Sequence, residues 1–510
     1  MSSQMVVVAS RFSATLISLV LLSACGGGGG GGSSTVVPPN SGGTPPPVAQ
    51  KCSANNPFRV DAVAPTTVGT LADEKSWVQN YVNGAYLWYN EMPSVNASLA
   101  AYSNEADVFG SLQNYFNALL TPARTTSGKL KDEFSFIYST KQWRELSQSG
   151  TSLSFGIEWY LASSTPPRGI RVAYVEPNSP AAQQGLQRGD TLVSFDGVSA
   201  DTNVQSELDT LNQIFSPSNG NGRSFVFDRN GSQVTAFFGA SEVVKQPVLI
   251  SNTLDINGQK VGYMVFNDHI ASAEQPLIDS FTQFSNAGIS DLILDLRYNG
   301  GGYLFLASEV AYMIAGPTRT SGKYFEKLQY NDKRVADNNQ APTPFYNTSC
   351  IINSQFQCTG NQSLPNLNLG RVFVLTSKST CSASEAIING LEGIDVQVIR
   401  IGATTCGKPY GFTAKDNCGI SYFPIEFKGI NFKGFGDYAD GFSAQCAAAD
   451  DFSKALGDTS EGMLAAALYR RANGSCPATT GQQKLSVEQQ GAVVHEPVRS
   501  NRFVLPEAGR

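Results

Sequence analysis

From about residue 244 onward, short apolar runs rich in β-branched residues alternate with segments of helical spacing. Strands are predicted at 261–266, 291–296, 372–376 and 396–401, and helices at 275–284, 304–314 and 384–391. Strands that alternate with helices build βαβ units, which predicts an α/β domain with a largely parallel sheet. In such sheets, functional groups gather where strands end and helices begin. The alternation therefore also predicts where a site should lie.

Composition limits the classes of partner. The 510 residues include 36 Lys and Arg against 42 Asp and Glu, a net charge of −6. A nucleic-acid surface needs clustered excess basic residues, so no nucleic-acid partner is expected. At ~150 residues per domain, the length predicts roughly three domains. The long apolar run at the N-terminus has no counterpart further along, which excludes a multi-span membrane protein.

The apolar run at 12–22 follows Arg11 and is too short for a bilayer span, as in the core of a signal peptide. It leads into Leu22-Ser-Ala-Cys25, which resembles a bacterial lipoprotein signal. The resemblance implies a signal peptide at 1–24, lipid on Cys25 and a Gly/Pro/Ser tether at 25–66. The protein then contacts the outer membrane of a bacterial cell envelope only through this anchor. The alternative is an ordinary cleaved signal and a periplasmic protein.

Of nine cysteines, eight remain besides Cys25, and an even number in an exported chain permits four disulfides. Short spacings favour Cys350–Cys358 and Cys406–Cys418, with Cys446–Cys476 as a third pair. No C-x-x-C occurs and the only histidines are His269 and His495, so no metal site is expected.

Residues 67–148 show helical apolar spacing, and residues 149–243 contain a distinctive run. The run is Val175-Glu-Pro-Asn-Ser-Pro-Ala-Ala-Gln-Gln-Gly-Leu-Gln-Arg-Gly-Asp190, followed by a predicted strand at 191–195. This order of turns, short helix and strand resembles a PDZ domain. The resemblance implies that a loop of Phe155, Gly156 and Ile157 captures a peptide C-terminus while the peptide adds a strand. The alternative is a PDZ domain that only packs against its neighbour and regulates it.

Three motifs follow predicted strands. In Asp295-Leu-Arg-Tyr-Asn-Gly-Gly-Gly-Tyr303, open backbone N–H groups suit an oxyanion, a phosphate or a structural turn, although no phosphate-loop pattern is present. In Ser379-Thr-Cys-Ser-Ala-Ser-Glu385, a hydroxyl stands at a helix start, where a capping box is the alternative. In Gly402-Ala-Thr-Thr-Cys-Gly-Lys-Pro409, the lysine has small and apolar neighbours, whose desolvation lowers a lysine pKa and makes it a base. A solvated surface lysine is the alternative.

Together, after a helical region and a PDZ domain, these motifs resemble the C-terminal processing peptidases, the tail-specific serine proteases. The resemblance covers about residues 67–440. It implies a multidomain α/β fold whose peptidase domain is of the crotonase or Clp-protease type. By matching motifs, it implies Ser382 as nucleophile and Lys408 as general base, with Thr405 orienting the lysine amine. It also implies that Gly300, Gly301 and Ala383 form an oxyanion hole. Glu385 and Thr405 are implied as supporting residues.

The sequence departs from the family pattern at three positions. Phe412 stands where the family has an orienting glutamine, and Gly393 replaces an aspartate, although Asp395 is close. Cys381 directly precedes the serine. These departures leave the Ser-Lys pair intact. They place its supporting residues in question.

The sequence predicts a serine endopeptidase without a cofactor, with a peptidase domain at 244–470 and a tail at 471–510. It would cleave envelope or exported proteins near accessible C-termini, with an adaptor or activator as a further partner. A catalytically idle PDZ adaptor and a hydrolase of non-peptide envelope material are the alternatives. The aspartates at 437, 440, 450 and 451 predict solvated loops rather than calcium ligands. A helix is predicted at 461–471, and the last ~35 residues predict a loose tail.

Overall fold

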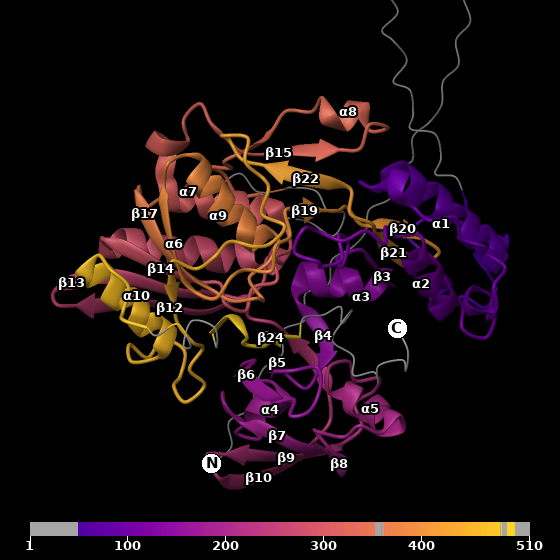
Figure 1. Cartoon of the computed structure of the whole chain (residues 1–510), viewed down its shortest axis with the longest axis horizontal. Coiled ribbons are helices and arrows are strands. Elements are labelled where there is room, and N and C mark those ends of the chain that lie inside the picture. Colours follow the sequence, from indigo (N-terminus) through magenta and orange to yellow (C-terminus); the bar gives the residue numbers. More distant parts are fainter. Residues whose placement is uncertain (1–48, 352–358, 360–361, 480, 482–486, 495–510) are drawn as a thin grey trace, which may run out of the picture. The chain divides into compact units, whose positions relative to one another are not determined.

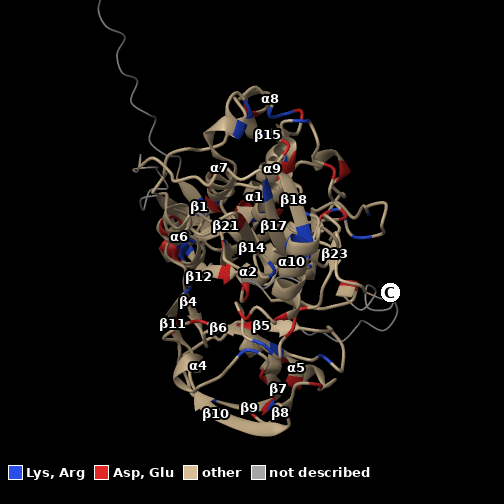
Figure 2. Ribbon diagram, turned by 90° about the vertical axis from the view of Figure 1, so that its left-hand side faces the viewer, with Lys and Arg blue, Asp and Glu red and all other residues tan. Residues whose placement is uncertain are grey.

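The computed structural model describes residues 49–351, 359, 362–479, 481 and 487–494 (Figure 1). The signal peptide, Cys25 and most of the tether therefore lie outside the described residues. Among the described residues, the search for membrane spans finds no helix with the length and apolar character to cross a bilayer. Basic and acidic positions are interspersed along the ribbon in the view of Figure 2.

A six-stranded sheet forms the core of the region after residue 244, in the order β12-β13-β14-β17-β18-β23. Its strands are β12 (Val248–Ile256), β13 (Gln259–Phe266), β14 (Asp291–Asp295), β17 (Arg371–Thr376), β18 (Gln397–Gly402) and β23 (Cys446–Ala447). β12 pairs antiparallel with β13, and every later pair is parallel. The predicted α/β fold and largely parallel sheet are confirmed.

The strands are buried on both faces because their apolar side chains alternate between two clusters. Leu292 and Leu294 of β14 join one cluster, whereas Ile293 between them joins the other. The first cluster is covered by α6 (Glu274–Ala287), α7 (Leu304–Thr320) and α9 (Ala383–Gly393), and the second by α10 (Gly462–Asn473) (Figure 1). The four helices lie where the sequence predicts them.

The helical region contributes to the fold of the chain that follows. Its main helices are α1 (Leu71–Ala85) and α2 (Val108–Ala118), followed by β3 (Phe136–Ser139) and α3 (Thr140–Arg144). β3 pairs antiparallel with β21 (Ile420–Phe423), which also pairs with β20 (Lys415–Asn417). Ile420 and Tyr422 complete the apolar cluster of the two helices. Residues 67–148 and the strands after Lys408 thus share one core.

A second group of short strands flanks the region after Lys408. β15 (Tyr324–Tyr330) pairs with β22 (Phe427–Ile430) and with β16 (Thr343–Pro344). β22 also pairs with β19 (Tyr410–Gly411), which carries the chain away from Lys408. α8 (Val335–Asn338) follows β15.

The PDZ-like region contains a sheet with the order β10-β9-β7-β6-β5-β24, with β8 beside β7. Its elements are β5 (Ile157–Leu161), β6 (Arg171–Val175), α4 (Pro180–Gln183), β7 (Thr191–Phe195), β8 (Val198–Ser199), α5 (Gln205–Leu211), β9 (Arg223–Arg229) and β10 (Ser232–Phe238). β4 (Thr151–Ser154) and β11 (Ser241–Val244) form a separate pair at its two ends. The last strand, β24 (Ala492–Val493), comes from the C-terminal segment. The prediction of a loose tail is therefore wrong for residues 487–494.

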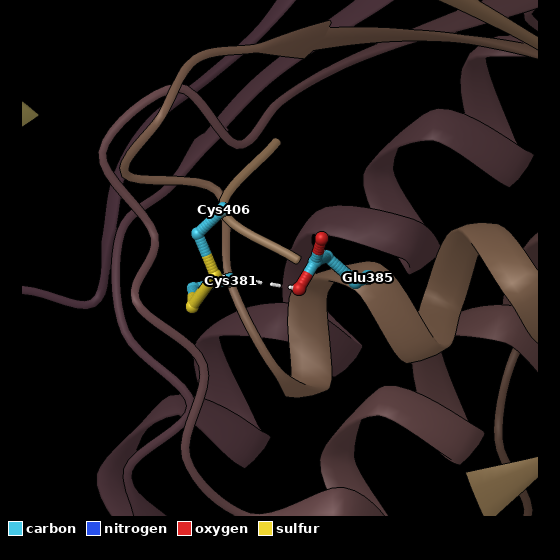
Figure 3. A group of neighbouring side chains, drawn as sticks. All are labelled: Cys381, Glu385 and Cys406. Carbon is cyan, nitrogen blue, oxygen red and sulfur yellow. Dashed lines mark hydrogen bonds between the residues drawn. A yellow bond between two sulfur atoms is a disulfide. The ribbon is translucent and has the colours of Figure 1, made fainter. Parts of the chain in front are cut away.

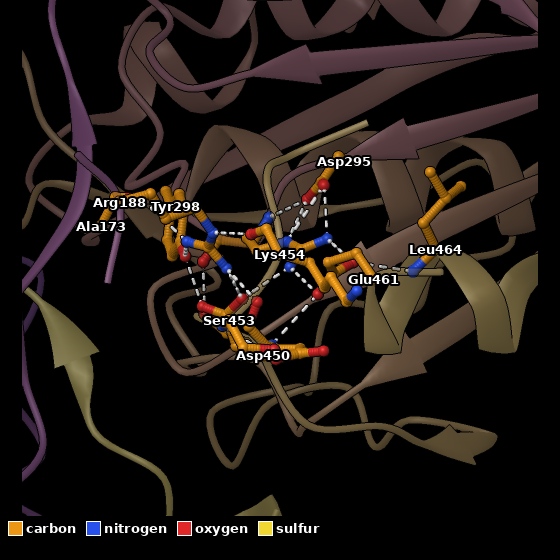
Figure 4. A network of polar contacts seen from close by, with 12 residues as sticks. Ala173, Arg188, Asp295, Tyr298, Asp450, Ser453, Lys454, Glu461 and Leu464 are labelled. Atoms are coloured by element: carbon orange, nitrogen blue, oxygen red, sulfur yellow. Dashed lines mark hydrogen bonds and ion pairs between the residues drawn. The ribbon is translucent and has the colours of Figure 1, made fainter. Parts of the chain in front are cut away.

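A buried ionic network joins the PDZ-like region to the larger sheet (Figure 4). Arg297 donates to Asp295, Asp450 and Glu461, with nitrogen–oxygen distances of 2.7–3.1 Å. Arg188, from the turn before β7, pairs with Asp450 at 2.5 Å. The side chain of Asp450 is only 6% exposed, so the prediction of a solvated loop is wrong at this aspartate.

The disulfides correct part of the predicted pairing. Cys446–Cys476 is confirmed, but Cys406 pairs with Cys381 and Cys418 pairs with Cys52. The predicted pair Cys406–Cys418 is wrong because Cys406 lies in the loop after β18, next to Cys381, whereas Cys418 lies in the turn between β20 and β21, next to Cys52. Cys358, of the predicted pair Cys350–Cys358, lies outside the described residues. Short sequence spacing did not predict the Cys52–Cys418 disulfide because its two cysteines are 366 residues apart in the sequence.

Candidate active site

Ser382 stands at the turn between β17 and α9, in a strained backbone conformation. Its φ of 55° and ψ of −116° lie outside the regions that residues with a side chain ordinarily occupy. The strain is held by neighbours: the Cys381 N–H and the Ser384 hydroxyl both donate to the Asn299 carbonyl, at 3.0 and 3.1 Å. Backbone strain that the surroundings enforce clusters at functional sites. The turn therefore has the character of a reactive position.

The capping box predicted as the alternative is also present. Ser382 and Glu385 occupy its two positions, and the Glu385 carboxylate accepts the Ser382 N–H at 3.0 Å. An ordinary N-cap residue has an extended backbone, however, and that of Ser382 is not extended. Capping alone leaves this conformation unexplained.

Glu385 connects the serine turn to the lysine loop. Its fully buried carboxylate accepts the Thr405 hydroxyl at 2.5 Å and the N–H groups of Gly407 and Lys408 at 2.9 and 2.8 Å. Burial raises the pKa of Glu385, and these hydrogen bonds oppose the rise. The carboxylate thus fixes the backbones of Ser382 and Lys408 relative to each other.

The Thr405 hydroxyl also accepts the Phe442 N–H at 2.7 Å. These contacts make it a support for Glu385, and the lysine-orienting role remains a prediction. The Lys408 side chain is half-buried, with Nζ 4.3 Å from the ring centre of Phe412 and 5.3 Å from that of Phe134. An aromatic ring, that of Phe412, therefore borders the amine at the position where the family pattern has a glutamine.

The glycine loop after β14 reaches the serine turn. A side chain on Gly301, whose φ is +96°, would place Cβ 2.7 Å from Ser382 Cβ and 2.9 Å from the Ala383 nitrogen. The Gly301 N–H is already donated to Asn299 Oδ1 at 2.9 Å. Within the described chain, the N–H groups of Gly300 and Ala383 donate no hydrogen bond. Of the three predicted oxyanion donors, these two are open.

His269 supports the glycine loop, a role that the sequence analysis missed. Its Nδ1 lies 2.9 Å from Asn299 Oδ1, and its backbone bridges to Gly302. Burial lowers the pKa of His269 to about 4, so the ring is neutral at pH 7. Because Asn299 Oδ1 accepts, Nδ1 carries the proton. No local pattern signals this contact, since the pairing of β13 with β14 brings together two segments that are 30 residues apart in the sequence.

A disulfide lies beside both predicted catalytic residues. Cys381 and Cys406 are bonded, one residue before Ser382 and two before Lys408. Together with Glu385 they bring three atoms of metal-ligating type within 4.8 Å (Figure 3). Sulfurs that are bonded to each other are not thiolates, so this group offers one carboxylate and no cysteine ligand.

The loop predicted to capture a peptide C-terminus lies directly before β5. Phe155 and Ile157 are buried, and Gly156 has a φ of +79°. The Gly156 N–H donates to Ser154 Oγ at 2.9 Å, and its carbonyl accepts the Glu176 N–H at 2.9 Å. The Ala181 N–H donates to the Phe155 carbonyl at 3.1 Å, which ties the loop to the start of α4.

Comparison with known proteins assigns these regions. The sequence profile of peptidase family S41 matches residues 260–414, which include the glycine loop, Ser382 and Lys408. The PDZ profile matches residues 171–211.

Residues 260–414 therefore form a peptidase S41 domain.

Two curated relatives of this chain carry the name carboxyl-terminal-processing protease. The protein from Picosynechococcus sp. is 26% identical over 186 residues, which cover 36% of this chain and 44% of the relative. That from Synechocystis sp. is 24% identical over 184 residues, or 36% and 42% of the two chains. The chain thus spans less than half the length of these relatives.

A crystal structure from Bacteroides fragilis, assigned to the S41 proteases, has the same fold. It is 24% identical and superposes with a TM-score of 0.57 over 78% of this chain and 97% of the other. The predicted combination of a PDZ domain with an S41 peptidase domain is confirmed.

Proposed function

We propose that the chain is a serine endopeptidase that cleaves proteins near their C-termini, with Ser382 as nucleophile and Lys408 as general base. The observation that carries the proposal is the Glu385 carboxylate, which hydrogen-bonds the backbones of both residues. The match of residues 260–414 to peptidase family S41 and the names of the two curated relatives support the same activity.

In the proposed reaction, the neutral amine of Lys408 takes the proton from the Ser382 hydroxyl as Oγ attacks the peptide carbonyl. The lysine then returns the proton to the leaving amine, and an acyl-enzyme forms. Water, deprotonated by the same amine, releases the acyl group. The turn at Ser382 presents Oγ at the start of α9, where the helix favours developing negative charge.

The N–H groups of Gly300 and Ala383 would stabilise the oxyanion of this reaction. Both are open, and the close approach of Gly301 brings the glycine loop to the Ala383 nitrogen. The loss of one oxyanion donor typically lowers kcat by ~10²–10³. The PDZ domain would deliver a substrate protein by binding the C-terminal tail of that substrate along a strand edge.

The site of action is proposed to be the bacterial envelope. The sequence before Cys25 has the pattern of a lipoprotein signal, and the disulfides agree with an oxidising compartment. Labelling with a radioactive fatty acid tests the anchor, because a Cys25→Ala chain should lose the label.

The decisive experiment is digestion of an unfolded protein with an apolar C-terminus. We expect cleavage by the wild type, none by Ser382→Ala or Lys408→Ala, and normal cleavage by Lys378→Ala, which removes an exposed lysine two residues after β17. Cleavage that survives in both dyad variants would contradict the assigned site. A wild type that never cleaves would contradict the peptidase itself.

One observation favours the second candidate, a catalytically idle adaptor. Aromatic faces attract an ammonium ion, and Nζ of Lys408 lies 4.3 Å from the Phe412 ring centre. In an adaptor, Lys408 would serve as a cation packed on this ring and not as a base. An adaptor would keep its biological effect in the Ser382→Ala chain, whereas a peptidase would lose it.

A further inference from the structure

The C-terminal segment of the chain occupies the peptide-binding edge of the PDZ domain. β24 pairs antiparallel with β5, with Ala492 opposite Leu161 and Val493 opposite Tyr160, and the Val494 N–H donates to the Trp159 carbonyl at 2.9 Å. The segment therefore runs toward the loop of Phe155, Gly156 and Ile157. This is the strand and the direction that an added tail would use.

Only one edge of β5 is available for an added strand. Its other edge pairs with β6, so β24 takes the remaining row of backbone groups. A second extended peptide has no place on β5 while β24 is there.

The side chains of the segment are buried as those of a ligand would be. Val494 is 7% exposed and belongs to the apolar cluster of the PDZ domain, with Ile157 of β5 and Leu208 of α5. Val493 is 3% exposed and packs in a cluster that contains Tyr160 and Tyr298. The groove thus accepts a small β-branched aliphatic side chain.

The same segment contacts both loops of the proposed active site. The Val493 N–H donates to Ser379 Oγ at 2.9 Å, three residues before Ser382. The Glu488 carboxylate accepts the Thr404 N–H at 3.2 Å, four residues before Lys408. Whatever removes the segment from β5 also releases these two contacts.

We propose that residues 487–494 are an internal ligand of the PDZ domain, and that an aliphatic protein tail binds by displacing them from β5. The inference rests on the proposed function for the identity of the incoming tail. Because the segment is tethered, its effective concentration is high, and the affinity for an external tail is reduced by the fraction of chains with an open edge. Displacement would couple tail capture to the loops of Ser382 and Lys408.

The test measures binding of a fluorescent peptide with an aliphatic C-terminus to the full chain, in a Ser382→Ala background that prevents cleavage. Val494→Asp places a charge in the apolar cluster and should open β5, so we expect binding at least ~10-fold tighter. Val193→Asp is the matched control, because it adds the same charge at a 48% exposed site on β7 and should leave the affinity unchanged. Equal affinities in all three chains would overturn the inference.

Hydrogen exchange of the chain that carries neither Val494→Asp nor Val193→Asp gives an independent readout. Added peptide should speed exchange at residues 491–494 as β24 leaves β5. Peptide that binds while these amides keep their protection overturns displacement, even if Val494→Asp does not fold. Because neither measurement needs cleavage, an inactive peptidase contradicts the proposed function and leaves this inference standing.

Discussion

The PDZ domain and the S41 domain each begin a helix with a serine against which a glycine of positive φ packs. In the PDZ domain, Gly156 packs on Ser179 at the start of α4, and in the S41 domain, Gly301 packs on Ser382 at the start of α9. The serines differ in backbone conformation. Ser179 is extended, with φ −74° and ψ 166°, whereas Ser382 has φ 55° and ψ −116°.

The difference separates a serine that caps a helix from the serine proposed as nucleophile. Ser179 is an ordinary cap whose hydroxyl accepts the Ala182 N–H at 3.2 Å. Ser382 occupies a costly conformation that contacts to Asn299 and Glu385 maintain. Similar glycine–serine packing thus serves a cap in one domain and a strained turn in the other.

The largest effect is expected from Gly301→Ala, which breaks the S41 side of the comparison. The added Cβ meets Ser382 Cβ at 2.7 Å, and φ of +96° strains any side chain. The loop must move away from the serine, so kcat should fall by ~10²–10³. Gly322→Ala is the control, since its φ is +72° but no atom lies within 4 Å of the new Cβ. Equal losses in both variants would contradict a role in the site.

The contact between the two domains is tested with Asp450→Asn. Breaking a buried ion pair typically costs ~3–5 kcal/mol of unfolding free energy, and Asp450 serves Arg188 and Arg297 at once. Asp437→Asn, at a side chain 88% exposed, should cost almost nothing.

The same aspartate predicts a pH dependence. Burial raises the pKa of Asp450, but Arg297 and Arg188 outweigh burial and hold the pKa below its ordinary value. A lowered folded-state pKa stabilises the protein above the ordinary aspartate pKa of ~3.9, and the stabilisation is lost as the pH falls through the folded value. Acid titration followed by circular dichroism should show this loss in the wild type and less of it in Asp450→Asn.

A second disulfide closes a loop of similar length and serves as a control for the disulfide beside Ser382. Cys381–Cys406 and Cys446–Cys476 close loops of similar length, with sequence separations of 25 and 30, so removal of either should cost ~3–4 kcal/mol of stability. Replacing the first pair by alanine should also lower kcat ~10-fold, because the serine and lysine loops lose their covalent link. An equal kcat loss on replacing the second pair would mean that the effect is general destabilisation.

The smallest effect tests the structural serine. Ser179→Ala should cost ~1 kcal/mol of unfolding free energy, as for other N-caps, and leave hydrolysis of a short peptide unchanged. Ser382→Ala should abolish hydrolysis without a comparable loss of stability. A loss of hydrolysis in Ser179→Ala would remove the distinction between the two serines.

Local patterns predicted the elements well because each depends on neighbours in the sequence. The apolar alternation predicted β13, β14, β17 and β18, and the capping box at Ser382 and Glu385 is present as expected. The motifs also placed the serine, the lysine and the glycine loop at strand ends, where the parallel sheet brings them together. Patterns failed where partners are distant, as for Cys52 with Cys418 and His269 with Asn299.

The sequence by itself determined the peptidase S41 domain and its largely parallel sheet, and it indicated the candidate site residues, because periodicity and short motifs are local properties. Tertiary structure alone decided the strain at Ser382, the engagement of the Gly301 N–H and the burial of Asp450. It also brought a C-terminal segment without strong periodicity onto β5. These features arise from contacts between segments hundreds of residues apart or from surrounding hydrogen bonds, which no local pattern encodes.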